Sequence, residues 1–169
     1  MQARAVVEQF CRLEAQGAGL DGDSPTSQAL WALTTDDWGG VDATRTLVSG
    51  FKVDSVRRKD GKVLVRVVYR VVGSMDAGFA VHPRDEESAH VYEVTPTKAG
   101  WRIAARTVEF SGHLSPMALL RHFEENLLPP CRADATTLDR ERGWCEQIVA
   151  SIAQLKALAK RLETTGKRH

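Results

Sequence analysis

The sequence predicts an α+β fold in which one strongly curved antiparallel sheet carries helices packed against it. Three observations predict it. An amphipathic helical pattern opens the chain, a meander of long strands runs from Leu47 to Phe110, and a new helix begins at Ser115-Pro116. Apolar residues at every second position, between segments where they recur about every 3.6 positions, are typical of this class. A length of 169 residues suits a single domain.

Two helices are expected before the sheet. Residues 3–16 place their apolar side chains on one stripe at helical spacing, and Gly17 and Gly19 end the helix. A shorter helix starts at Ser24-Pro25, because serine caps a helix and proline fits its first turn. The two helices supply these candidate core residues: Val6, Val7, Phe10, Cys11, Leu13, Leu30, Trp31 and Leu33.

The strands are predicted at 47–58, 63–72, 88–95 and 101–110. Asp60-Gly61 predicts a tight hairpin turn between the first two strands, because it supplies the positive φ angles that such a turn needs. The odd-numbered residues from Val63 to Val71 are all apolar and predict the core face of the second strand. Residues 73–87, rich in Gly, Asp and Glu, are interpreted as a loop.

The C-terminal part is predicted to form two helices. The first starts at Ser115-Pro116, points Met117, Leu120, Phe123 and Leu127 inward and ends at Pro129-Pro130. The second covers about 137–162. It carries an apolar seam that either folds back onto the domain, the interpretation we favour, or pairs with a second subunit. The seam consists of Ile148, Ile152, Leu155, Ala159 and Leu162. The predicted organisation is a domain at 1–128 and a helical extension at 129–169 packed on it.

Composition and charge exclude several classes of protein. The net charge of +1 gives no field that would draw the chain to nucleic acid, and no apolar run is long enough to cross a membrane. No signal-peptide core follows Met1, so the chain as written is expected in the cytoplasm, or in the periplasm or outside the cell if a signal was removed. Cys11, Cys131 and Cys145 lack metal-ligand spacing. Separate burial of Cys131 and Cys145 is favoured over a disulfide, and no metal or cofactor is expected.

Three segments together resemble the nuclear transport factor 2-like superfamily. They are Val6 to Cys11 in the first helix, Val63 to Tyr69, and Gly100-Trp101-Arg102-Ile103 on the last strand. Trp101 and Ile103 are expected to be core residues. Arginine outnumbers lysine 16 to 7, which favours a bacterial branch. The resemblance implies a cone-shaped sheet with a pocket between its concave face and the helices. It also implies that enzymes of this fold use an acid or base inside the cone, and no residue of this sequence maps onto theirs.

The functional hypotheses follow from that pocket. The first is a domain that binds a small hydrophobic molecule without catalysis and forms a homodimer, with Tyr69, Trp38, Phe51 and Thr107 as ligand-binding candidates. The alternative is a cofactor-free isomerase, dehydratase or cyclase using His90, Tyr92 and Glu109, since proton transfer beside a carbonyl needs a base and a phenol donor. A second alternative is a protein-interaction module that uses the C-terminal helix. Enzymatic function is left open and is not the favoured interpretation.

Overall fold

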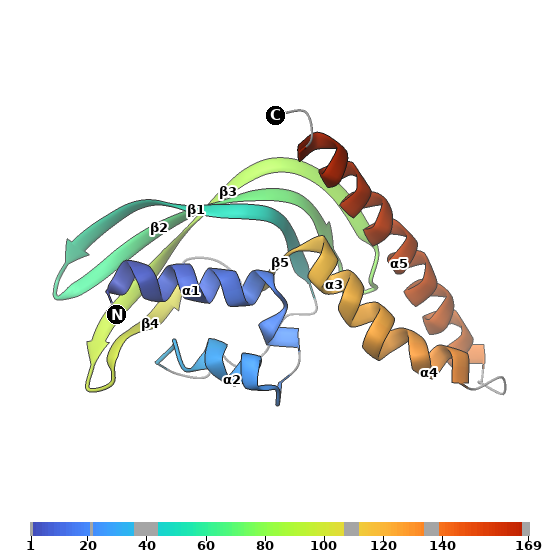
Figure 1. Ribbon diagram of the computed structural model, residues 1–169, viewed down its shortest axis with the longest axis horizontal. Helices are drawn as coiled ribbons and strands as arrows, with labels where there is room; N and C mark the ends of the chain where they lie inside the picture. The colour runs from blue at the N-terminus through green and yellow to red at the C-terminus, as the bar shows by residue number, and fades with distance from the viewer. Residues whose placement is uncertain (1, 21, 36–43, 107–111, 134–138, 167–169) are drawn as a thin grey trace.

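The computed structural model describes residues 2–20, 22–35, 44–106, 112–133 and 139–166. The described residues form an α+β protein with one five-stranded mixed sheet that does not close into a barrel. Helices α1 (Ala3–Ala15) and α2 (Pro25–Trp31) precede the sheet. Ser24 caps α2 by accepting a hydrogen bond from the Ser27 amide at 3.1 Å, as predicted. Figure 1 shows the sheet arching over α1, with the C-terminal helices at one end.

The sheet has the strand order β4-β3-β2-β1-β5. Its long strands are β1 (Arg45–Lys59), β2 (Lys62–Met75) and β3 (Val81–Thr97), and β4 (Gly100–Arg106) lies beside β3. The turn between β1 and β2 has positive φ angles at Asp60 (52°) and Gly61 (77°), which confirms the predicted hairpin.

Two sequence-based expectations about the strands are wrong. Residues 73–87 are not a loop, because β2 continues to Met75 and β3 starts at Val81. The short turn between them is held by the Asp76 carboxylate, which accepts hydrogen bonds from the Gly78 amide at 2.9 Å and the Ala80 amide at 3.0 Å. The charges that suggested a loop lie on exposed strand positions, where Arg84 pairs with Glu86.

The second difference is β5 (Gly112–Leu114), which the sequence did not predict. It runs parallel to Arg45–Leu47 of β1, so the sheet is mixed and not purely antiparallel. Three residues are too few for a period-2 pattern to be visible in the sequence. Strand β4 ends at Arg106 within the described residues, and residues 107–110 of the predicted strand lie outside them.

The helix after the sheet does not end at its two prolines. Ser115 caps α3 (Pro116–His122), a π-helical segment (η2, Phe123–Leu127) follows, and α4 (Leu128–Ala133) continues through Pro129 and Pro130. The π turn shifts the hydrogen-bond register, so the prolines fall in the first turn of α4, where missing N–H groups cost little.

Met117 was also expected to point inward, and its position is 49% exposed. Leu119 takes the inward place and is buried.

Two apolar clusters form the core. The first lies between α1, α2 and the concave face of the sheet. It contains the odd-numbered residues Val63 to Val71, which confirms the predicted register of β2. Ile103 is buried there, whereas Trp101 is only half-buried at its edge, which corrects the expectation that both are fully inside.

The second cluster forms where α5 (Asp139–Gly166) folds back along α3, as favoured from the sequence. Ile148, Leu155 and Leu158 are buried there with Val72 of β2, while Leu64 and Val68 lie outside both clusters. Gly73 allows a close approach at this contact, because a Cβ on it would lie only 3.1 Å from both the Leu158 side chain and the His82 backbone oxygen.

Cys131 and Cys145 form a disulfide, which overturns the expectation that they are buried separately. Their Cα atoms are 5.5 Å apart, and the bond joins the end of α4 to the start of α5. The continuation of α4 past its prolines brings Cys131 to this position. No helix in the described part of the chain is long and apolar enough to span a bilayer.

Candidate functional site

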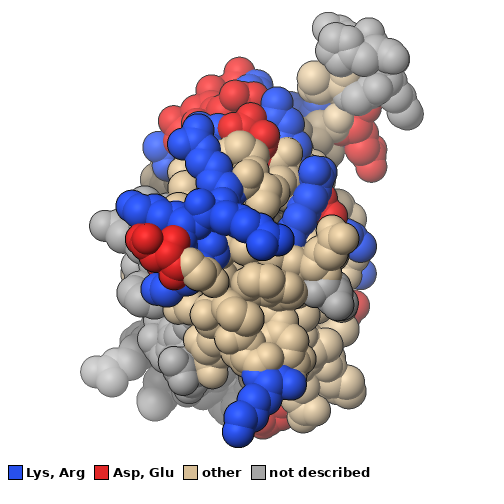
Figure 2. All heavy atoms as spheres, turned by 90° about the vertical axis from the view of Figure 1, so that its left-hand side faces the viewer, with Lys and Arg blue, Asp and Glu red and all other residues tan. Residues whose placement is uncertain are grey.

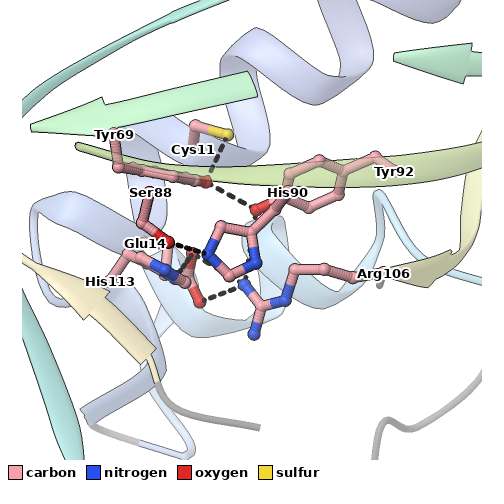
Figure 3. A network of polar contacts seen from close by, with 8 residues as sticks. All are labelled: Cys11, Glu14, Tyr69, Ser88, His90, Tyr92, Arg106 and His113. Carbon is pink, nitrogen blue, oxygen red and sulfur yellow. Dashed lines mark hydrogen bonds and ion pairs between the residues drawn. The ribbon is translucent and has the colours of Figure 1, made fainter. Parts of the chain in front are cut away.

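Polar side chains from five elements converge beneath the arch of the sheet (Figure 3). Each is placed by the register of its element. His90 lies opposite Val67, Tyr92 lies opposite Val65, and Arg106 lies opposite Tyr92. All of these positions therefore face the concave side that α1 covers. We call the following residues the inner cluster: Cys11, Glu14, Tyr69, Ser88, His90, Tyr92, Arg106 and His113.

A chain of hydroxyl and thiol groups forms the centre of the inner cluster. The Tyr69 and Tyr92 hydroxyls are 2.5 Å apart, and the Cys11 Sγ lies 3.0 Å from the Tyr69 hydroxyl. Burial raises the pKa of both phenols well above the ordinary value of 10, and the neighbouring tyrosine and cysteine raise that of Tyr69 further. Burial also raises the pKa of the Cys11 thiol to about 12. At neutral pH these three groups are uncharged.

A buried ion pair closes one side of the inner cluster. Arg106 Nη1 donates to both Glu14 carboxylate oxygens, at 3.1 and 3.2 Å, and to the Tyr92 hydroxyl at 3.3 Å. The two charged side chains are 7% and 9% exposed. Burial raises the pKa of Glu14, and the adjacent guanidinium opposes that rise. Burial alone would lower the pKa of Arg106, but the Glu14 carboxylate raises it overall. Arg106 therefore stays charged and neutralises Glu14.

His113 is the least satisfied member of the inner cluster. Its side chain is 2% exposed, and its ring stacks on Tyr69 with centroids 4.2 Å apart. Among the described residues its Nδ1 has no hydrogen-bond partner, and the nearest Glu14 oxygen is 3.8 Å away. Burial, Arg106 and His90 together lower its pKa to about 3, so the imidazole is neutral at pH 7.

The predicted catalytic residues are partly brought together. His90 and Tyr92 are both buried on the concave face, as their spacing indicated, and His90 Nε2 lies 3.1 Å from the Ser88 hydroxyl. The His90 and His113 rings approach edge to face at 4.7 Å between centroids. Glu109 lies outside the described residues.

Two of the four predicted ligand-binding residues lie in or beside the inner cluster, and the other two lie outside the described residues. Tyr69 belongs to the inner cluster, and Phe51 is half-buried beside it with ring centroids 6.2 Å apart. Trp38 and Thr107 lie outside the described residues.

Sequence reasoning missed Glu14, Arg106 and His113 as site residues. Glu14 did carry a signal, because it falls on the apolar stripe of the first helix, and a carboxylate on a buried stripe needs a partner. Nothing in the sequence linked it to Arg106, 92 residues away. No sequence motif points to His113, because Ser111-Gly112-His113 does not match a nucleophile elbow.

The chemistry available is proton donation and acceptance by neutral groups around one fixed ion pair. In the part of the chain that the structure describes, no three His, Cys, Asp or Glu side chains are grouped so that they could hold a metal ion. No family model, curated protein or solved structure matches this chain.

Proposed function

We propose that the chain is a nuclear transport factor 2-like protein that binds a small, largely apolar molecule at the inner cluster. The observation that carries the proposal is the buried Nδ1 of His113, which has no hydrogen-bond partner among the described residues. An unsatisfied buried polar atom costs about 1–3 kcal/mol, and a ligand atom that bonds to it would recover that cost.

The electrostatics of the inner cluster favour an uncharged ligand. Glu14 and Arg106 neutralise one another, and the two tyrosines, Cys11 and His113 are neutral at pH 7. A charged ligand would lose its hydration without meeting an opposite charge. A neutral molecule with one hydroxyl or carbonyl would instead exchange hydrogen bonds with the imidazole or a phenol while its apolar part contacts the surrounding side chains.

A second candidate function is cofactor-free acid–base catalysis of the isomerase, dehydratase or cyclase type. One observation favours it, since Tyr92 is a phenol that receives a hydrogen bond from the Arg106 guanidinium at 3.3 Å. A cation beside a phenol strengthens it as a donor to a developing oxyanion. His90 would move the proton in this reaction, with Glu109 as a further acid or base. The helix-mediated interaction module loses support, because the α5 seam packs against its own chain.

Binding is tested with a thermal-shift panel of neutral alicyclic and aromatic ketones, alcohols and phenols, followed by titration calorimetry. A compound that stabilises the intact protein should lose about five- to tenfold in affinity in Tyr92→Phe and His113→Phe, since one hydrogen bond is worth about 1–1.5 kcal/mol. Lys52→Ala, on the opposite face of the sheet, is the matched control and should bind normally. Equal affinity in all four proteins would contradict the proposed site.

Catalysis is separated from binding with the same compounds. If the inner cluster transfers protons, a bound ketone should exchange its α-hydrogens with D₂O, followed by NMR, and His90→Gln should abolish the exchange while binding persists. Binding without exchange would leave the non-catalytic function as the conclusion.

A further inference from the structure

Strand β1 has an open edge along most of its length, although it is the second strand from one end of the sheet. On one side it pairs with β2, and on the other β5 covers only Arg45–Leu47. From Val48 to Lys59 the described part of the chain places no strand against that edge. Alternate backbone N–H and C=O groups there point away from the sheet, as they do at any strand edge, and such an edge is a template for another strand.

The open edge carries cations that no acidic side chain in the described part of the chain neutralises. Lys52, Arg57, Arg58 and Lys59 are exposed, and none of them has an ion-pair partner among the described residues. Neighbouring cations are paired, since Lys62 contacts Glu93 and Arg66 contacts Asp54. Figure 2 shows the lysine and arginine side chains gathered at the end of the molecule that the β1–β2 hairpin forms.

The backbone register locates the most regular part of this edge. Irregularities interrupt β1 near Val48 and between Val53 and Ser55, and the stretch Ser55–Lys59 then pairs with β2 without interruption. Val56 lies in this stretch. It shares the face of Val65, its partner on β2, and is 44% exposed. An added strand would therefore meet a continuous run of backbone groups, basic side chains on both faces and one apolar contact.

We infer that β1, from Ser55 to Lys59, docks an extended acidic segment of a partner protein, which adds to the sheet as a further strand. Charge decides the occupant, because a second copy of this chain would bring two sets of cations together at the same edge, and like charges directly opposite are destabilising. A phosphate polymer or an anionic membrane would meet the cations but leave the edge amides without strand partners. An acidic peptide in extended form would neutralise the cations and would also pair with the edge amides.

The probe is a fluorescein-labelled peptide, acetyl-Glu-Val-Glu-Val-Glu-Val-Glu-amide, followed by fluorescence anisotropy with the intact chain. Binding should weaken about tenfold or more in the double variant Arg57→Glu/Arg58→Glu. It should also weaken as the salt concentration rises, because salt screens ion pairs at the exposed rim of an interface. The matched control Arg121→Glu/Lys160→Glu carries the same change of charge on α3 and α5, at the opposite end of the molecule from the β1–β2 hairpin, and should bind as the unmodified protein does. Thermal unfolding checks that both variants are folded.

Two further measurements distinguish strand addition from simple charge attraction. The same peptide with all its backbone amides methylated keeps its charge but has no amide donors, and it should bind at least about tenfold more weakly. Hydrogen exchange should slow at 55–59 when the unmethylated peptide is added. Equal binding of the methylated peptide, equal loss in both variants, or binding of a single-stranded oligonucleotide or anionic vesicles in place of the peptide would each overturn the inference.

Discussion

The neutral, buried imidazole of His113 should make the protein sensitive to acid. Its pKa falls from an ordinary 6.5 to about 3 on folding, because burial, Arg106 and His90 all oppose its charge. Between these values the unfolded chain binds a proton that the folded chain does not. The free energy of unfolding is therefore highest above pH 6.5 and declines as the pH falls towards 3.

The magnitude follows from the separation of the two pKa values. One pH unit corresponds to about 1.4 kcal/mol, so His113 alone should remove about 2–3 kcal/mol of stability between pH 6.5 and 4.5. Glu14 acts in the opposite direction. Burial raises its pKa, and it therefore favours the folded state as it takes up a proton at lower pH. Because Glu14 is present in each protein compared, its contribution cancels in the difference.

The assay is urea unfolding of the intact protein and of His113→Phe at pH 7 and pH 4.5. Phenylalanine keeps a ring against Tyr69 but does not titrate, so the variant should lose less stability on acidification by about 2–3 kcal/mol. His122→Phe, a half-buried histidine on α3, should keep the acid sensitivity of the unmodified protein. Parallel losses in the intact protein and in His113→Phe would refute the assignment of a neutral buried imidazole.

Four further outcomes are expected, three from urea or thermal unfolding and one from size-exclusion chromatography. Val67→Ala should cost about 1–3 kcal/mol, because its side chain is fully buried in the first cluster. Trp101→Ala should cost about 1–2 kcal/mol, less than a fully buried tryptophan, because the indole is half-buried. A chain that ends at Cys131 should aggregate on size-exclusion chromatography, since the second cluster would be uncovered; an unaltered monomer would contradict this. Reduction of Cys131–Cys145 should cost up to about 3 kcal/mol, and Cys131→Ser/Cys145→Ser should be insensitive to the reductant.

The fold was predictable wherever a long periodic pattern met a clear turn or cap. The alternation from Val63 to Val71, the Asp60-Gly61 turn and the caps at Ser24 and Ser115 each specify local structure by local means. The π turn before Pro129-Pro130 left no such signal, because it depends on hydrogen-bond register and not on side-chain type. The short parallel strand β5 left no such local signal either.

The inner cluster was predictable only where the period of one strand sets the face of a member, as it does for Tyr69 on β2. His90 and Tyr92 are two residues apart on β3, so their common face follows from the strand period. The contact between Glu14 and Arg106 depends on how α1 crosses the sheet. A periodic pattern within one element carries no information about that crossing. The same holds for the stacking of His113 on Tyr69, which depends on where β5 joins β1.

The composition of the inner cluster is itself an argument for a role beyond packing. Apolar side chains of similar volume would fill the space beneath α1 without the desolvation of two charges and without an unsatisfied imidazole nitrogen. Glu14 and Arg106 offset much of their own cost by pairing, and the two tyrosines satisfy one another. His113 has no such compensation within the described residues. A site that binds a ligand is where such a local cost is expected, which is why the proposed function rests on this histidine and not on the better-satisfied tyrosine pair.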